Sequence, residues 1–251
     1  MTDDRIYTAA LIIIGNEILS GRTQDANLAY VANGLNKSGV RLAEVRVVPD
    51  IDTKIIKAVN ELRIENDYVF TTGGIGPTHD DITSHSIAAA FGVKVIRHPD
   101  AEKLLRDHYG ADINDSRLKM AEVPEGSDLI PNPVSRAPGF RITNVHVLAG
   151  VPRIMKAQFD GVCLQLDGGK PVKSRSLVAH LAESVMAEEL GKIQERYPSS
   201  DVGSYPFMRA GKSGTAIVVR DIEQVTVDAV IEEVRTMMTG FGVEPEVEVQ
   251  L

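Results

Sequence analysis

The chain has little of what several classes of protein depend on. Its 251 residues contain one cysteine, Cys163, and no tryptophan. A single cysteine excludes an internal disulfide framework and a cysteine-rich metal site, and its apolar neighbours indicate a small buried side chain rather than a nucleophile. No run approaches the roughly 20 apolar residues that span a bilayer, and the acidic start Met1–Arg5 does not resemble a signal peptide. We therefore expect a cytoplasmic protein with no membrane partner.

Aromatic residues and positive charge are also scarce. Phe, Trp and Tyr make up 5% of the chain, and the formal net charge is −8. Nucleic-acid binding needs a basic footprint, and single-strand binding adds aromatic surfaces on which bases stack. We therefore expect a small-molecule ligand and no nucleic-acid partner. The hydrophobic content of 43% is ordinary for a soluble globular protein.

The first two thirds of the chain alternate apolar strands with amphipathic helices. Strands are predicted at residues 6–14, 40–48, 68–71 and 145–148, and helices at 25–36, 51–64, 82–91 and 154–159. This order is typical of an α/β fold with a doubly wound, mostly parallel sheet covered on both faces. Residues 98–136 are less regular. There, 101–109 and 116–120 look helical, and a proline-rich stretch follows that we interpret as a loop excursion, with room for a small flanking sheet.

From residue 168 onward the pattern predicts a separate, small α+β domain. Strands are expected at 173–178, 201–208, 215–220 and 243–249, and helices at 181–196 and 225–238. The order βαββαβ matches a ferredoxin-like split βαβ unit. Because the linker Leu166–Pro171 contains two glycines and a proline, we expect domains at 1–167 and 168–251.

The stretch from Asp67 to Asp81 carries the clearest chemical signal. A buried strand leads into Gly73-Gly74-Ile75-Gly76 and then into two adjacent carboxylates, Asp80 and Asp81. Glycines let the backbone adopt positive φ and approach a ligand closely, and a helix N-terminus attracts phosphate. The carboxylates suit a divalent cation beside that phosphate, or hydrogen bonds to a sugar or heterocycle. The alternative is helix capping, worth about 1 kcal/mol without any ligand, which accounts for one aspartate more easily than for two.

Three glycine turns are expected to meet at one edge of the sheet. Gly15, Gly73 and Gly150 each follow a predicted strand, and ligands of open α/β sheets bind at the carboxyl ends of the strands. This convergence is the strongest structural argument for a site. The segments Asn132-Pro133 and Ala137–Gly139 are equally consistent with a pocket rim and with simple turns.

Two other features carry less weight. His79 lies beside the carboxylates, but a lone histidine at a helix start more often makes local hydrogen bonds than acts as an acid or base. Lys212–Gly214 resembles the end of a P-loop only superficially. It lacks the upstream glycine at the required spacing and falls in a predicted hairpin, so we reject that interpretation.

Six motifs in consecutive order resemble the N-terminal half of CinA proteins. They are Ile14–Gly21, Thr71–Thr83, Val123–Gly126, Asn132–Val134, Ala137–Phe140 and Leu148–Pro152. The resemblance covers residues 6–160 and is to the CinA-type branch of the molybdopterin-binding (MoaB/Mog-like) superfamily, to which the molybdopterin-binding-like half of eukaryotic FAD synthase is similar. Gly203–Pro206 extends it into the second half, which resembles the small KH-like domain of CinA proteins.

The resemblance leaves three classes of function open. In the CinA branch it implies a pyrophosphatase, dependent on Mg²⁺, Mn²⁺ or Co²⁺, that hydrolyses the diphosphate of a nucleotide such as ADP-ribose or FAD. In the Mog branch it implies binding or adenylylation of molybdopterin, although the arginine usual before the aspartate is His79 here. The third class is a non-catalytic nucleotide-binding regulatory module. Relatives of this fold often form dimers or trimers, so the resemblance is compatible with a homo-oligomer.

Two departures from CinA proteins limit what is carried over. The resemblance stops before the C-terminal amidase domain of full-length CinA, so nicotinamide mononucleotide amidase activity is not expected. Where many relatives have a Gly-x-Gly-Glu-Ser turn in the second domain, this chain has His180-Leu-Ala-Glu-Ser184. That difference weakens any claim that the small domain binds phosphate there.

Carried over residue by residue, the resemblance implies the following roles. The diphosphate would be bound by Thr72, Gly73, Gly74, Gly76, Pro77, Thr78 and Thr83. Asp80 and Asp81 would hold the divalent metal, and Glu17 would be the general base. A role for Glu17 in a turn or a helix cap is equally consistent with the sequence. Gly15, Asn16, Ser20, Asp25 and Asn27 would lie near the ligand at the end of the first strand, with Asn132 and Gly150 on the opposite side. Some relatives have Asp at position 16, so the neutral Asn16 removes one candidate base or metal ligand.

Overall fold

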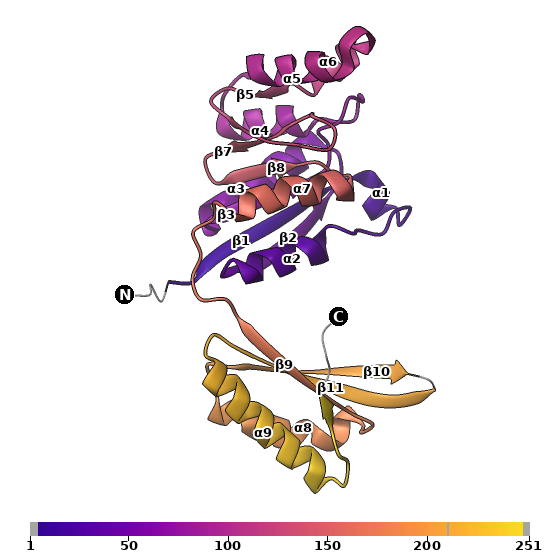
Figure 1. Ribbon diagram of the computed structural model, residues 1–251, viewed down its shortest axis with the longest axis vertical. Coiled ribbons are helices and arrows are strands. Elements are labelled where there is room, and N and C mark those ends of the chain that lie inside the picture. The colour runs from indigo at the N-terminus through magenta and orange to yellow at the C-terminus, as the bar shows by residue number, and fades with distance from the viewer. Residues whose placement is uncertain (1–4, 210, 248–251) are drawn as a thin grey trace. The chain divides into compact units, whose positions relative to one another are not determined.

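The computed structural model describes residues 5–209 and 211–247, and the chain divides into two compact units between Lys170 and Pro171. In the first unit the strands are β1 (Tyr7–Ile14), β2 (Val40–Val48), β3 (Tyr68–Thr72), β4 (Val95–Arg97), β5 (Glu122–Pro124), β6 (Asp128–Ile130), β7 (Gly139–Ile142) and β8 (Val145–Leu148) (Figure 1). The helices are α1 (Asn16–Leu19), α2 (Leu28–Lys37), α3 (Asp52–Glu65), α4 (Thr83–Phe91), α5 (Pro99–Tyr109), α6 (Asp115–Lys119) and α7 (Pro152–Cys163), with a 3₁₀ turn at Gly110–Asp112. No described helix of the chain is both long and apolar enough to cross a membrane.

The main sheet of the first unit has the order β2-β1-β3-β8-β7-β6 among the described residues. The pairs β1–β2, β1–β3 and β3–β8 are parallel, whereas β7 and β6 run antiparallel at one edge. The predicted doubly wound, mostly parallel α/β fold is therefore confirmed. This topology brings the carboxyl ends of β1, β2, β3 and β8 to the same edge of the sheet.

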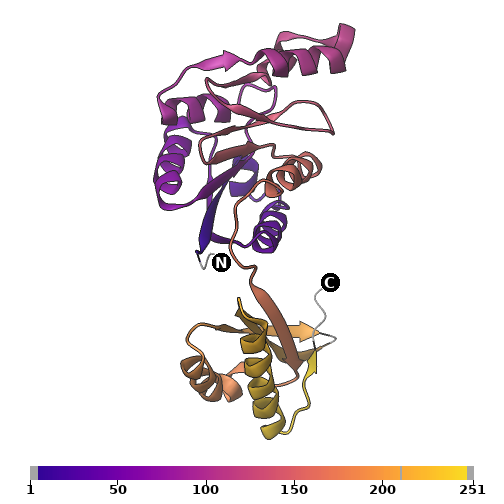
Figure 2. The same cartoon turned by 60° about the vertical axis from the view of Figure 1, so that its left-hand side comes forward.

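Both faces of the sheet are covered by helices, as the unbroken apolar run of β1 requires. Ala10, Ile12 and Ile14 pack in the cluster that contains the apolar residues of α3 and α4. The alternate residues Ala9, Leu11 and Ile13 pack against α2 and α7. Figure 2 shows these two helix pairs on opposite sides of the sheet.

Cys163, at the end of α7, fits its predicted role as a small apolar side chain. It packs at the margin of the cluster formed by α2 and α7, and it forms no disulfide. Burial raises the pKa of its thiol to about 11. The thiolate, which is the reactive form of cysteine, is therefore disfavoured at neutral pH.

The region between β4 and β8 contains more regular structure than the sequence predicts. The two predicted helices are present as α5 and α6, and β4 pairs with β5 in a small antiparallel sheet. The proline-rich stretch, which we expected to be a loop, also contributes β6 and β7 to the main sheet. Strands of three and four residues are too short to produce a clear alternation of apolar and polar residues, which explains why this expectation was wrong.

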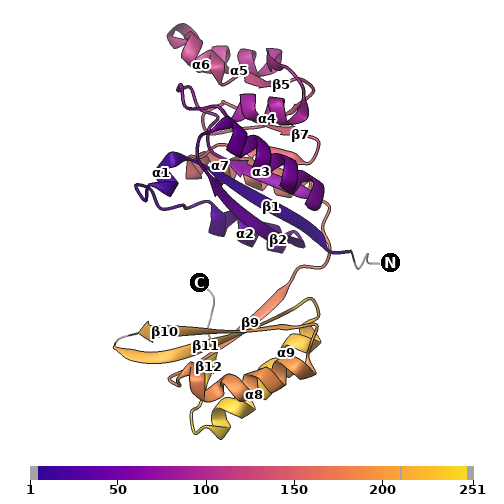
Figure 3. The same cartoon turned by 180° about the vertical axis from the view of Figure 1, so that it is seen from behind.

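The second unit is the predicted small α+β domain. Its elements are β9 (Lys173–Ala179), α8 (Glu183–Arg196), β10 (Asp201–Arg209), β11 (Lys212–Asp221), α9 (Gln224–Gly240) and β12 (Glu246–Val247). The strands pair antiparallel in the order β10-β11-β9-β12, with α8 and α9 packed on one face (Figure 3). The predicted closing strand is described only at Glu246 and Val247, because residues 248 and 249 lie outside the described ranges.

Candidate functional site

A cavity of about 370 Å³ lies at the carboxyl edge of the main sheet. Its walls come from the end of β1, from the segments that follow β1, β2, β3 and β8, from the start of α7, from Met120 just after α6, and from the loop between β6 and β7. The lining residues are Ile14, Gly15, Glu17, Asp50, Gly73, Gly74, Ile75, Gly76, Pro77, Thr78, Asp80, Asp81, Met120, Asn132, Ser135, Ala137, Ala149, Gly150, Val151 and Ile154. The three glycines that follow β1, β3 and β8 are thus brought to one cavity.

The ends of three strands approach one another closely because glycines stand there. Gly73 has a φ of 106°, and a Cβ atom on it would lie 2.2 Å from the carbonyl oxygen of Ile14. A Cβ on Gly150 would lie 3.2 Å from the Cα of Gly73. Gly74 also has positive φ, at 67°, whereas Gly76, for which we expected the same, does not. At Gly76 the space is filled instead by Asp81, whose Oδ2 would lie 2.7 Å from an added Cβ.

The glycine turn after β3 offers unpaired backbone donors to the cavity. The N–H of Gly73 donates to Leu148 O at 3.2 Å and closes the strand pairing. The N–H groups of Gly74, Ile75 and Gly76 donate to no other group among the described residues. Residues 74–76 are half-buried, and three successive N–H groups without a protein partner beside a cavity are suited to bind an anion.

The loop that follows is closed between Thr78 and Asp81. Thr78 donates to Asp81 Oδ2 from its backbone N–H, at 2.8 Å, and from its hydroxyl. Lys119 of α6 donates to the carbonyl oxygen of Thr78. Helix α4 begins at Thr83 after Ile82, with no side chain as its cap, so helix capping by Asp80 or Asp81 is not what the structure contains.

Asp80 and Asp81 differ in their surroundings. One oxygen of Asp81 is occupied by Thr78, while Asp80 is exposed at the tip of the loop. The Thr78 hydroxyl, which lies near both carboxylates, is the main cause that lowers the pKa of Asp80 below its ordinary value, and the charges of His79 and Lys119 add to it. Asp80 is therefore a carboxylate at any pH near neutrality. His79 is exposed and does not line the cavity.

Two more carboxylates line the cavity, from the segments that follow β1 and β2. A Cβ on Gly15 would lie 2.5 Å from Glu17 Oε1, so the Glu17 carboxylate folds back over the end of β1. Asp50, which follows β2, accepts the N–H of Asn16 at 2.9 Å. Asp50 is not among the predicted site residues, although it follows a parallel strand, which is the same signal that marks Gly15 and Gly73.

The loop between β6 and β7 forms a rim rather than a simple turn. Asn132 is buried, and its amide nitrogen donates to Ser135 Oγ and Ala137 O, both at 2.7 Å. Its Oδ1 accepts the N–H groups of Val134 and Ser135 at 2.9 and 3.1 Å. The side chain of Asn132 is thus used in shaping the loop, while Asn132, Ser135 and Ala137 line the cavity.

Six residues expected near the ligand do not line the cavity: Asn16, Ser20, Asp25, Asn27, Thr72 and Thr83. Asp25 accepts the N–H groups of Asn27 and Leu28, at 3.1 and 2.7 Å, and so caps the start of α2. Asn27 is buried and donates to Gly150 O at 2.9 Å, which ties α2 to the turn after β8. These two residues therefore support the cavity from behind.

The other four are likewise placed in the framework. Thr83 is buried and donates to Gly73 O at 3.0 Å, which fixes the glycine turn to α4. Thr72 is buried within β3. Asn16 meets Asp50 only through its backbone N–H, and Ser20 donates to Glu17 O at 3.3 Å at the end of α1.

The charge of the cavity wall is one-sided. Glu17, Asp50, Asp80 and Asp81 line it, and no Lys, Arg or His does among the described lining residues. No group of three His, Cys, Asp or Glu side chains is close enough to hold a metal ion by itself in the part of the chain that the structure describes. A cation at this site would therefore take some of its ligands from a bound molecule or from water.

Comparison with known proteins agrees with this architecture. The family described as "Probable molybdopterin binding domain" matches residues 10–167, and the "FAD synthase, middle domain" matches residues 171–247. A protein of Pyrobaculum calidifontis is 38% identical over 186 residues, 71% of this chain and 69% of its own length. The chain is 34% identical over 209 residues to a CinA-like protein of Desulfosudis oleivorans, which corresponds to 78% of this chain and 51% of that protein.

A solved structure extends the agreement to three dimensions. The protein CinA from Thermoplasma acidophilum, described as of unknown function, is 35% identical with a TM-score of 0.60, and covers 64% of this chain and 98% of its own. The family match spans more than half of the chain. The chain therefore belongs to the molybdopterin-binding-domain family, in its CinA-like form, and its residues 171–247 are similar to the FAD synthase middle domain.

Proposed function

We propose that the cavity binds and hydrolyses the diphosphate of a nucleotide such as ADP-ribose or FAD, with a divalent cation. The proposal rests on two features of the same cavity. Three N–H groups, at Gly74, Ile75 and Gly76, have no protein partner, and the wall contains four carboxylates and no basic side chain among the described lining residues. The donors suit an anion, but the carboxylates repel one. A cation between the carboxylates and the phosphates resolves this conflict.

The two carboxylates of the loop suit Mg²⁺ or Mn²⁺, which completes its coordination with oxygens of the substrate and of water. Mg²⁺ in phosphate-transferring sites takes one or two carboxylates, and phosphate oxygens and water complete its shell. Asp80 and the free oxygen of Asp81 would supply those carboxylates. When bound, the cation supplies Lewis acidity at phosphorus and neutralises charge on the phosphate oxygens.

The protein's own residues have three tasks under this proposal. The N–H groups of the glycine turn bind and orient a phosphate. Glu17, whose carboxylate lies beside Gly15 and lines the cavity, accepts the proton of the attacking water. The apolar wall that includes Pro77, Val151 and Ile154 receives the flat heterocycle and excludes water from that side.

The direct test is to incubate the purified protein with ADP-ribose, FAD and NAD in Mg²⁺, Mn²⁺ or Co²⁺ and to separate the products by chromatography. We expect release of AMP from at least one of them, and no release in EDTA. Ranking the initial rates identifies the substrate class. Absence of cleavage under every condition, with a correctly folded protein, would contradict the proposal.

Binding of molybdopterin is the second candidate, and the family match over residues 10–167 favours it. The same cavity would hold a pterin against its apolar wall and the phosphate at the glycine turn. Tight binding of molybdopterin, with adenylylation when ATP and Mg²⁺ are added and no cleavage of dinucleotides, would select this function. Nucleotide binding with no turnover of any kind would leave a regulatory module.

A further inference from the structure

We infer that Lys119 is a positioning residue for the loop that carries Asp80 and Asp81, and that α6 is thereby a working part of the site. This inference deepens the proposed function and rests on it for its catalytic consequence. It concerns a contact that joins residues 41 positions apart in the chain, between α6 and the carbonyl oxygen of Thr78.

The first argument is the position of the contact within the loop. Thr78 O accepts both the ammonium of Lys119 and the N–H of Asp81, the latter at 3.4 Å. Thr78 in turn donates to the Asp81 carboxylate from its N–H and hydroxyl. The other described hydrogen bonds of this turn are made within residues 78–81. Lys119 therefore connects the turn to α6. A hydrogen bond from a charged donor is stronger than a neutral one.

The second argument is the way in which α6 is anchored. Ala101, Leu105 and Ala121 are fully buried in a small core of their own, against which Met120 and Ala137 pack. Met120 and Ala137 also line the cavity. One rigid unit therefore forms a cavity wall with Met120 and holds the carboxylate loop with the neighbouring Lys119.

The third argument is electrostatic. Lys119 brings a positive charge beside two adjacent carboxylates, where it and Asp81 share a small recess with Ser84, His85 and Glu122. Thr78 bonds directly to Asp81, and Lys119 holds the carbonyl group of Thr78, so Lys119 acts on both carboxylates through this residue. Two ligands that must meet one cation lose affinity when their separation fluctuates.

The test compares Lys119→Met, Lys119→Arg and a control, Lys103→Met, at an exposed position of α5. Two quantities are measured: hydrogen exchange of the Thr78 and Asp81 amides, and the Mg²⁺ concentration for half-maximal cleavage of the best substrate. We expect Lys119→Met to raise both by about 10-fold or more, in line with the loss of a hydrogen bond to a charged group. Lys119→Arg, which can donate to the same carbonyl, should restore both to within about 3-fold of wild type, and Lys103→Met should match wild type.

The two readouts separate this inference from the proposed function. Unchanged amide exchange in Lys119→Met, or a defect in Lys119→Arg as large as in Lys119→Met, overturns the positioning role. If the wild type cleaves no dinucleotide, the exchange measurement still decides whether Lys119 holds the loop, and the failure belongs to the proposed function alone. Should Lys119→Met not fold, the Arg variant and Lys119→Gln provide the same comparison.

Discussion

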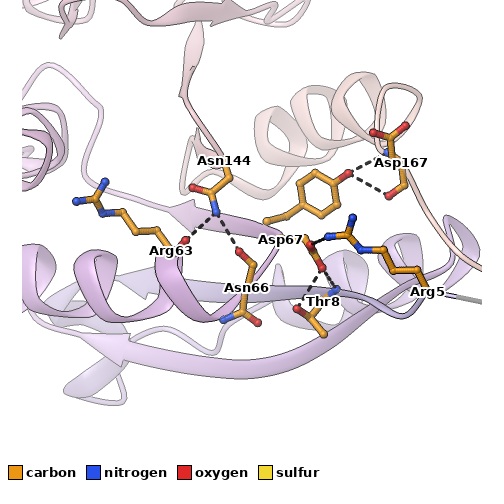
Figure 4. Close-up of polar contacts among 8 residues, drawn as sticks. Arg5, Thr8, Arg63, Asn66, Asp67, Asn144 and Asp167 are labelled. Atoms are coloured by element: carbon orange, nitrogen blue, oxygen red, sulfur yellow. Dashed lines mark hydrogen bonds and ion pairs between the residues drawn. The ribbon is translucent and has the colours of Figure 1, made fainter.

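The two ends of the main sheet use polar residues in opposite ways. At the amino end, polar groups satisfy one another (Figure 4). Asp67 accepts the N–H of Thr8 at 2.8 Å and pairs with Arg5, and the amide of Asn144 donates to the carbonyl oxygens of Arg63 and Asn66, both at 3.0 Å. In a separate contact, the hydroxyl of Tyr68 donates to the carbonyl oxygen of Asp167 and accepts its N–H, both at 3.0 Å.

At the carboxyl end the corresponding groups are left open. The glycine turn keeps three N–H groups without a partner, and four carboxylates line the cavity without an opposing basic side chain. Native proteins pair nearly all their buried polar groups, and exceptions concentrate where a ligand binds. Both ends are therefore polar, and they differ in whether the polar groups are paired within the protein.

The largest expected effect comes from removing a carboxylate at the open end. Asp80→Asn should lower the rate of diphosphate cleavage by about 1000-fold, since a metal-held charge contributes several kcal/mol to catalysis. Asp81→Asn should also abolish turnover. The free energy of unfolding of Asp80→Asn should stay within about 0.5 kcal/mol of wild type, because the residue is exposed.

A matched control is Asp107→Asn, an exposed aspartate of α5 that does not line the cavity. Initial rates at saturating Mg²⁺ give the comparison. If Asp80→Asn keeps its rate within about 3-fold of Asp107→Asn, the metal role of the loop is wrong.

The next largest effect is expected on the pH dependence of stability, and it comes from a buried histidine near the amino end of β8. His146 of β8 is stacked on Phe70 at 5.0 Å, and burial, together with the charge of Arg141, lowers its pKa from 6.5 to about 4. Between these values the unfolded chain binds more protons than the folded one, so stability falls as the pH drops from 6.5 to 4. We expect His146 to lower the free energy of unfolding by about 2 to 3 kcal/mol as the pH falls over that range.

Urea denaturation at pH 7 and pH 4.5 tests this expectation. His146→Gln should lose less stability than wild type on acidification, because other titrating groups are common to both proteins. An equal loss in the two proteins would mean that His146 is not held neutral by the fold.

The smallest effect is expected from opening the amino-end network. Asp67→Ala removes the acceptor of the Thr8 N–H and the partner of Arg5, which should cost about 1 to 2 kcal/mol of unfolding free energy. The cleavage rate of the folded protein should not change. Asp128→Ala is the control, because it breaks a more exposed ion pair with Arg141 and should cost less than about 1 kcal/mol. A lower cleavage rate in folded Asp67→Ala would contradict the expectation that the amino end contributes to stability alone.

Much of the fold could be predicted because its elements have strong local patterns. The apolar run of β1 and the helical spacing in α2, α3 and α9 are long enough to define both type and extent. The edge strands β6 and β7 could not be predicted in the same way. They are short, the segment between them is rich in proline, and they join the sheet through the pairing of β7 with β8 and of β6 with β7, which no local pattern encodes.

The site shows the same limit. The sequence marks the glycine turn and its two carboxylates, because positive φ and adjacent charges leave local signatures. It does not show that Asp25, Asn27 and Thr83 support the cavity from behind, nor that Lys119 reaches Thr78. Those arrangements arise from tertiary packing, where a polar residue suited to a ligand is equally suited to a buried hydrogen bond.

The most direct test of the central claim is whether nucleotide binding requires a cation. Isothermal titration calorimetry with a methylene-bridged, uncleavable analogue of ADP-ribose would compare excess Mg²⁺ with EDTA. Four carboxylates and no basic side chain in the cavity wall predict binding at least about 100-fold weaker in EDTA, because no cation then separates the diphosphate from the carboxylates. Equal affinity under both conditions would contradict the account, since the glycine turn alone would then hold the anion.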